Sequence, residues 1–326
     1  MLTKTRSVPS KASYCKLPCP SGTQHTVCRR DNCKPVAFCR QEHITYEIRK
    51  ALTDAHNTLR NNLALGKEPD VKYTAANMRL FNYDMELEYI AQCYGNQCTQ
   101  PKEDPCRITS RFSTVAQITQ MYDDKTFNIL KWMEPQHVAG RFRNAYKDQK
   151  HTLDDSNYEN VYTGKQKDKW KYNDPFVQMI WAESDHIGCA INTQRTNKTT
   201  YKYSFRIVCY YSNIKTKGKK LFIVGPACSK CPSGTKCNER FTGLCGKTEP
   251  ISKDSSYGAI FPDDTAEAVR ERQEMEEQMD MWGVDDYELF NITDVKKGQS
   301  NVLFVVPNYL LIVTIFLTFL VHMKIV

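Results

Sequence analysis

Fourteen cysteines in a chain of 326 residues are the feature that most constrains its fold. Five of them lie between residues 15 and 39, and four lie between residues 228 and 245. An even number of clustered cysteines is typical of a disulfide framework, which forms and persists in oxidising compartments. Zinc is the alternative for the CxxC pair Cys228 and Cys231, but no second pair at zinc-ribbon spacing and no histidine pair follows it. The cysteines therefore predict an exported, disulfide-rich protein.

The two ends of the chain give different indications about export. The first 14 residues, MLTKTRSVPSKASY, contain no apolar segment of the kind that a signal peptide needs, so we expect the leader upstream of Met1. Residues 302–321 are apolar apart from Pro307 and Asn308, and twenty helical residues span about 30 Å, the thickness of a bilayer core. We expect a transmembrane segment there. A cleaved lipid-anchor signal and a buried core helix are the alternatives.

The surface chemistry agrees with an extracellular protein and offers little to nucleic acids. Sequons for glycosylation occur at Asn197 and Asn291. The formal charge of +8 is uneven, because residues 261–294 hold twelve acidic residues against two arginines. That segment predicts an acidic stalk over residues 248–301, with a partner-binding helix as the alternative. No RNA-stacking motif, zinc knuckle or basic recognition helix is present, so we expect no nucleic-acid partner. Basic runs at 164–172 and 214–220 are interpreted as solvated loops, with anionic surfaces as the alternative.

Periodicity predicts helices early in the chain and strands late, which indicates an α+β fold. An apolar stripe at three- and four-residue steps predicts a long helix from about Ile48 to Leu63, and Gly66 should end it. A second helix follows a cap at Asn82 or Asp84. A third helical segment covers residues 127–135 and ends at Pro135, and residues 136–172 are interpreted as surface loops. A strand is predicted around residues 201–211.

The stretch NDPFVQMIWAESDHIGCA, residues 173–190, is the one whose role most needs deciding. Asp174 is a helix cap and Pro175 suits the first helical position. A short apolar helix then turns into a strand that carries Cys189. A bridge from Cys189 to Cys209 would join two neighbouring strands as a hairpin. We therefore interpret this stretch as scaffold. No GxSxG elbow marks a serine nucleophile elsewhere.

Several motifs in the expected order resemble the CAP superfamily, and within it the insect venom allergen 5-like proteins. The pattern HNxxR occurs at residues 56–60, AANM at 75–78 and GNQC at 95–98, and DPFVQMIWAES at 174–184 is similar to the family signature GHYTQMVWANT. The lead YCKLPCPSGTQHTVC is similar to the family's N-terminal module. The resemblance covers about residues 14–212 and implies an α-β-α sandwich. His56 resembles the family's structural histidine, for which a packing role is expected.

Composition and the resemblance together predict five parts of the chain, and the resemblance implies most disulfide pairs. We expect a cysteine-rich lead at 1–42, a CAP domain at 43–224, a small cysteine-rich module at 225–247, the acidic stalk at 248–301 and the membrane segment at 302–321. The implied pairs are Cys15–Cys28, Cys19–Cys106, Cys189–Cys209, and Cys98 with Cys33 or Cys39, of which Cys39–Cys98 is preferred. Cys93 takes the remaining partner, and the four cysteines from Cys228 to Cys245 pair among themselves.

The family's central cleft usually holds two histidines and two acidic side chains, which are suitable ligands for Zn²⁺. By resemblance these positions fall on Glu103, on Gln117, on Pro135 or, with a shift, Gln136, and on Pro175; Glu134 is close but on another helical face. Both imidazoles are absent, so the expected ligand set is degenerate. We therefore expect no catalytic residue, no metal and no cofactor.

The leading hypothesis is a non-catalytic extracellular CAP protein, tethered to a membrane, that binds an unknown protein, lipid or small ligand. Two alternatives follow from the resemblance. One is a metal-dependent hydrolase or protease working in the CAP cleft, and the other is a carrier of lipids or sterols. Fold alone does not decide among them.

Overall fold

The computed structural model describes residues 11–29, 33–68, 73–98, 103–125, 128–149, 175–196, 203–254 and 256. The chain divides into two compact units, Met1–Arg272 and Gln273–Val326, and all described residues belong to the first. None of the helices within the described ranges is both long and apolar enough to cross a membrane. The expected membrane segment at 302–321, both sequons and most of the predicted acidic stalk lie outside the described residues.

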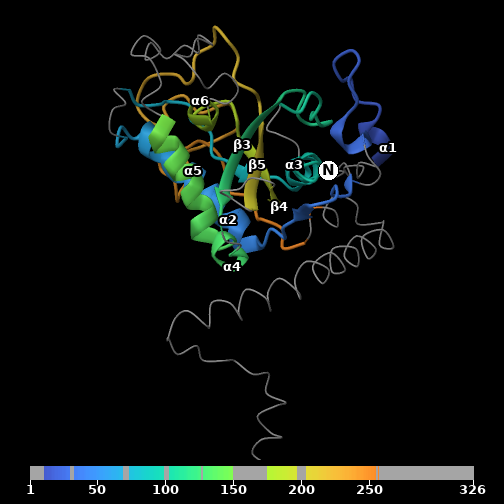
Figure 1. The fold of residues 1–326 in the computed structure, drawn as a ribbon. Helices are drawn as coiled ribbons and strands as arrows, with labels where there is room; N and C mark the ends of the chain where they lie inside the picture. Colours follow the sequence, from blue (N-terminus) through green and yellow to red (C-terminus); the bar gives the residue numbers. More distant parts are fainter. Residues whose placement is uncertain are drawn as a thin grey trace, which may run out of the picture. The chain divides into compact units, whose positions relative to one another are not determined.

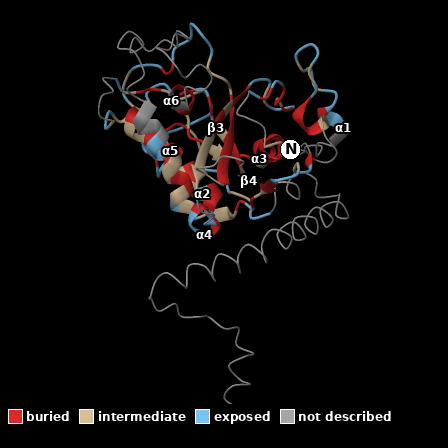
Figure 2. Cartoon of the chain, in the orientation of Figure 1, coloured by how far each residue is buried: buried red, intermediate tan, exposed pale blue. Residues whose placement is uncertain are grey.

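The centre of the described unit is one mixed β-sheet in the order β1-β4-β5-β3 (Figure 1). Its strands are β1 (Cys39–Gln41), β3 (Val115–Asp124), β4 (His186–Arg195) and β5 (Tyr203–Ser212). These pair antiparallel, and the short strand β2 (Asn82–Tyr83) pairs parallel to β4. Every residue of β5 is buried, as expected for a central strand covered on both faces (Figure 2).

Helices cover both faces of the sheet, which makes the predicted three-layer α-β-α sandwich. Helix α3 (Met85–Gly95) lies on one face, where Tyr94 packs near Tyr210 of β5. Helices α2 (Tyr46–Ala64) and α5 (Pro135–Gln149) lie on the other, where His56 contacts Tyr211. Consecutive residues of a strand point to opposite faces, so Tyr210 and Tyr211 anchor the two helical layers separately.

Local signals explain where the two principal helices begin and end. Thr45 caps α2 by accepting a hydrogen bond from the Ile48 N–H, and Gly66 follows the helix with φ +68°, a conformation that glycine tolerates best. Asp84 caps α3 through the Leu87 N–H. Both ends agree with the sequence prediction, and of the two proposed caps the structure uses Asp84.

The prediction for residues 127–149 was wrong in two respects. The first helix, α4 (Ile129–Trp132), is short, and Pro135 begins α5 instead of ending a helix. Proline suits that first helical position because its missing N–H is not needed there. Residues 136–149 are therefore helical where surface loops were expected. Three apolar residues, Val138, Ala139 and Phe142, are fully buried and supply the apolar face of α5.

Seven disulfides join the described cysteines, and none of these is free. The bonds are Cys15–Cys28, Cys19–Cys106, Cys33–Cys93, Cys39–Cys98, Cys189–Cys209, Cys228–Cys237 and Cys231–Cys245. They include the three pairs that the resemblance implies outright and, for Cys98, the preferred pair Cys39–Cys98. Three of these bonds join the N-terminal lead, with α1 (Lys11–Tyr14) and the 3₁₀ turn η1 (Thr26–Cys28), to the rest of the domain, and one of the three, Cys33–Cys93, ends on α3. The buried side chains of Tyr14 and Val27 belong to the same apolar cluster as α3.

The cysteine-rich module that follows β5 is attached to α2. The Arg240 guanidinium forms two hydrogen bonds with the Asp54 carboxylate, at 2.7 and 2.8 Å. The Gly243 N–H donates to the Asn61 side chain at 2.8 Å, and Cys245 exchanges backbone hydrogen bonds with the segment around Met78. The module is therefore packed on the domain and does not hang from it.

The chain after the module returns to the start of α2 and is fixed there. Arg49, almost fully buried, forms a two-armed ion pair with Glu88 of α3, with both N···O distances at 2.8 Å. Its remaining nitrogen donates to the carbonyl oxygens of Ser252 and Asp254. One guanidinium thus joins α2, α3 and the last part of the chain that the structure describes.

Candidate functional site

Two of the four positions expected to line a metal cleft lie beside Asp104 and β3. Gln117 lies in β3 and pairs with Tyr210 of β5. Its side chain accepts a 2.7 Å hydrogen bond from the Asp104 N–H and donates to the Thr119 hydroxyl. Glu103 has an exposed side chain that pairs with Arg107 at 2.6 Å. Both side chains therefore already serve local structure.

The other two positions lie in the segments next to α5. Glu134 directly precedes α5, next to α4, whose Trp132 packs on Phe205 of β5. Pro175 is the first residue of α6 (Pro175–Met179), and α4 and α6 contact α5 near its two ends (Figure 1). Glu103 and Gln117 thus lie beside Asp104 and β3, whereas Glu134 and Pro175 lie in the segments next to α5.

The HNxxR motif on α2 has a structural role throughout. The His56 ring is fully buried; Nδ1 lies 2.8 Å from the Leu52 carbonyl oxygen, and Nε2 lies 2.8 Å from the Tyr211 hydroxyl. Burial lowers the pKa of His56 to about 4, so the ring is neutral at physiological pH. Asn57 pairs with both backbone groups of Phe81. The packing role expected for His56 agrees with this environment.

Arg60, the last residue of that motif, determines the role of the stretch at 173–190. Its guanidinium is fully buried and donates to five backbone carbonyl oxygens, those of Arg79, Met179, Trp181, Ala182 and Ser184. Burial lowers the pKa of Arg60 to about 9, which still leaves it charged at pH 7. The segment between α6 and β4 is therefore shaped by an arginine beneath it, as expected for scaffold.

Asp104 is a buried junction that the sequence reasoning missed. Its carboxylate accepts hydrogen bonds from the hydroxyls of Thr26 and Tyr210, at 2.6 and 2.7 Å, and pairs with Arg29 at 2.7 Å. It thereby joins the N-terminal lead to the central strand β5. The position directly before Pro105-Cys106 was its only signal in the sequence.

A cluster at the start of β4 contains serine, histidine and aspartate but has the wrong connectivity for a catalytic triad. His186 Nδ1 lies 2.8 Å from the Asp185 carboxylate, and the Ser212 hydroxyl donates to that same carboxylate at 2.9 Å. The serine also accepts the backbone N–H groups of Asp185 and His186. A nucleophilic serine must instead give its proton to the histidine. Burial disfavours charge on His186, but Asp185 outweighs it and raises the pKa of the ring.

The CxxC pair of the module also belongs to the framework. The sulfur atoms of Cys228, Cys231 and Cys245 lie within 4.8 Å of one another, close enough for free thiolates at these positions to bind one metal ion. All three sulfurs are however bonded in disulfides, and zinc binds thiolates. As folded, this cluster offers no metal ligand.

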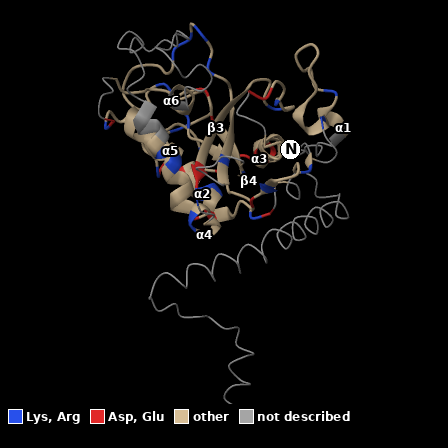
Figure 3. Cartoon of the chain, in the orientation of Figure 1, with Lys and Arg blue, Asp and Glu red and all other residues tan. Residues whose placement is uncertain are grey.

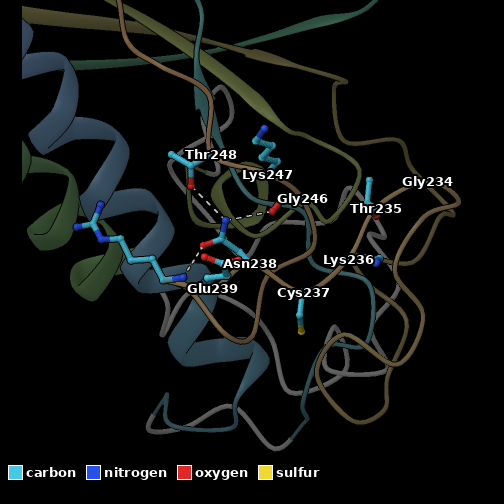
Figure 4. Close-up of a pocket in the computed structure, with 10 residues that line it drawn as sticks. Gly234, Thr235, Lys236, Cys237, Asn238, Glu239, Gly246, Lys247 and Thr248 are labelled. Atoms are coloured by element: carbon cyan, nitrogen blue, oxygen red, sulfur yellow. Dashed lines mark hydrogen bonds between the residues drawn. The ribbon is translucent and has the colours of Figure 1, made fainter.

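A hollow of about 610 Å³ lies in the same module (Figure 4). Its lining includes three basic side chains, those of Lys236, Arg240 and Lys247, against one carboxylate, that of Glu239. Asn238 shapes its floor, since its amide donates to the Gly246 carbonyl oxygen and to the Thr248 hydroxyl. The hollow therefore has a polar floor, and its basic lining residues are Lys236 and Lys247, because the Arg240 charge is already paired with Asp54.

Comparison with known proteins agrees with this architecture. The cysteine-rich secretory protein family, CAP, matches residues 53–211. The chain contains a CAP domain. A cysteine-rich venom protein of Tityus serrulatus is 29% identical over 69% of this chain and 52% of its own length, so only about half of that relative is matched. Venom allergen 5 of Polistes fuscatus is 28% identical over 61% of this chain and 92% of its own length.

The structure of BmVAL-1 covers 64% of this chain and 97% of its own, with 20% sequence identity and a TM-score of 0.49. The range matched by the CAP family contains the HNxxR motif at residues 56–60 and the four expected cleft positions, Glu103, Gln117, Glu134 and Pro175. The module at 225–247 and the N-terminal lead lie outside the matched range.

Proposed function

We propose that this CAP protein acts outside the cell as a non-catalytic binding protein, and that residues 302–321 hold it at a membrane. One observation carries the non-catalytic part of the proposal. Of the positions that resemblance assigns to the metal ligands, Glu103 and Gln117 are engaged in local bonds, and the proline side chain at 175 has no ligand atom. Metal-assisted hydrolysis needs ligands converging on one ion with an open coordination position.

The extracellular part of the proposal is supported by the disulfides. Seven bonds in one chain are typical of oxidising compartments and are rare where thiols are kept reduced. Relatives named as venom proteins are consistent with export.

A binding role is supported by one exposed face beside the module. Ile223 and Val224 are 45% and 48% exposed, and they pair through backbone bonds with the segment from Thr74 to Ala76, which follows the exposed Tyr73. The preceding loop carries three exposed lysines, at positions 217, 219 and 220 (charges in Figure 3). Exposed apolar side chains with a charged border are typical of contact surfaces.

Calorimetric titration of the full chain with Zn²⁺ tests the non-catalytic proposal. We expect no saturable heat at micromolar zinc, and no difference between the wild type and Glu103→Ala, because Glu103 pairs with Arg107 at the surface. Sub-micromolar binding that Glu103→Ala abolishes would overturn the proposal. Peptidase and esterase activity with and without a chelator is the companion measurement, and chelator-sensitive turnover counts against the proposal.

Surface expression behind a supplied signal peptide tests the tether. We expect the protein on the cell surface, retained after treatment with a phosphatidylinositol-specific phospholipase. Release by the enzyme would show that the protein is attached through a lipid anchor and not through a transmembrane segment. Recovery of all the protein from untreated medium would contradict any membrane attachment. A version that stops after residue 301 is the control that must be secreted.

A further inference from the structure

The two disulfides of the module form a pair that is set apart from the other five. The Cys228 sulfur, bonded to Cys237, lies within 4.8 Å of both sulfurs of the Cys231–Cys245 bond. Cys237 and Cys245 are also partners in an isolated antiparallel bridge. Each cysteine of one bond therefore has a sulfur or a backbone neighbour from the other bond beside it.

In the Cys228–Cys237 disulfide, the sulfur of Cys237 is accessible to a thiolate that enters the hollow. Cys237 is exposed and lines the hollow together with its neighbour Lys236 (Figure 4). By contrast Cys33, Cys93, Cys189 and Cys209 are buried. Thiol–disulfide exchange needs access to a sulfur and a thiolate to attack it, and nearby cations attract a negatively charged reagent.

We propose that the hollow is a docking site for small thiols that carry carboxylates, and that such a thiol forms a mixed disulfide with Cys237. The attacking thiolate forms a new S–S bond to Cys237 Sγ, and the Cys237–Cys228 bond breaks. The electron pair of that bond leaves with Cys228 Sγ, which becomes a thiolate.

The neighbouring bond gives the displaced sulfur a second partner. The Thr242 carbonyl oxygen lies 3.5 Å from Cys228 Sγ and 3.2 Å from Cys237 Sγ, so it faces both sulfurs of the bond that is attacked. The Cys228 thiolate attacks Cys231 Sγ, forms a Cys228–Cys231 bond and releases Cys245 as a thiolate. Cys245 then attacks Cys237 Sγ, forms a Cys237–Cys245 bond and expels the small thiol. The sequence exchanges two disulfides for two others, consumes no electrons and regenerates the thiol.

Incubation of the full chain with reduced glutathione, a tripeptide thiol with two carboxylates, tests the proposal. Acid quenching, alkylation and peptide mass spectrometry follow the products. We expect the first glutathione adduct on Cys237, then peptides linked through Cys228–Cys231 and Cys237–Cys245. Cysteamine, a cationic thiol, should react roughly tenfold more slowly at equal thiolate concentration. The double variant Cys231→Ser with Cys245→Ser should accumulate the mixed disulfide, because the second exchange is removed.

Charge variants separate docking from simple exposure. Lys236→Glu together with Lys247→Glu should abolish the preference for glutathione over cysteamine. Lys217→Glu with Lys219→Glu, two exposed lysines outside the module, should leave it unchanged. Equal rates for the two thiols in the wild type, or a first adduct on the exposed Cys15–Cys28 bond, would overturn the proposal.

Discussion

Replacement of Arg60 by methionine is the perturbation whose cost the structure defines best. Methionine fills much of the same volume without a charge, so the main change is the loss of five hydrogen bonds to backbone carbonyl oxygens. The carbonyls of Trp181 and Ala182 keep a backbone donor, from Ser184 and Arg79 respectively. The other three lose the donor that Arg60 supplied.

An unsatisfied buried polar group costs about 1–3 kcal/mol, and local relaxation recovers part of that sum. Because three buried carbonyl oxygens are left without a donor, we expect Arg60→Met to lower the free energy of unfolding by about 3–5 kcal/mol. Arg60→Lys keeps the charge and up to three donors, so it should cost less, about 2 kcal/mol.

Guanidinium denaturation with the disulfides intact measures these changes, and the fluorescence of the buried Trp181 reports on the segment that Arg60 holds. Arg79→Met is the matched control. Its guanidinium is partly exposed and pairs with Asp185 at the surface, so its loss should cost less than about 1 kcal/mol. A loss below about 1 kcal/mol for Arg60→Met would refute the reasoning, because the carbonyls would then need no donor.

Three further predictions each concern the surroundings of one residue: His56, Asp104 or Gly188. The pKa of His56 falls from 6.5 to about 4 on folding, so between these values the unfolded state binds more protons than the folded state. The free energy of unfolding should therefore be highest above pH 6.5 and decline by about 2–3 kcal/mol towards pH 4. Denaturation curves of His56→Gln should lack this part of the pH dependence. Asp104→Ala leaves the buried Tyr210 hydroxyl without its acceptor and should cost about 3 kcal/mol by the same measurement, whereas a cost near zero would contradict its junction role. Gly188→Ala would place a Cβ against the backbone of Glu88, so we expect loss of at least about 3 kcal/mol, seen as reduced secretion or a lowered Tm, and an unchanged Tm would refute it.

Features set by neighbouring residues could be predicted from the sequence. The stripe of α2, its stop at Gly66 and the cap at Asp84 depend on residues within a few positions of one another. The same local logic failed at Pro135, because proline both ends and begins helices, and only the burial of Phe142 on α2 decides which. Strand β3 was not predicted, since its sequence VAQITQMYDD alternates weakly.

The candidate site was predicted less completely than the fold. Alignment of motifs gives the positions of Glu103, Gln117, Glu134 and Pro175 along the chain, but their surroundings in the fold follow from strand order and helix placement. Those depend on contacts between distant residues, which local patterns do not encode. For the same reason the junction at Asp104 and the five-carbonyl role of Arg60 became visible only in three dimensions.

The grip of Arg49 on the carbonyls of Ser252 and Asp254 has a mechanical consequence. A pulling force applied to the chain beyond Asp254 would reach this guanidinium before it reached the sheet. Because the same side chain is paired with the buried Glu88, the load would be shared by α2 and α3. The domain would thus resist a pulling force at a residue that is bonded to both of its helical layers.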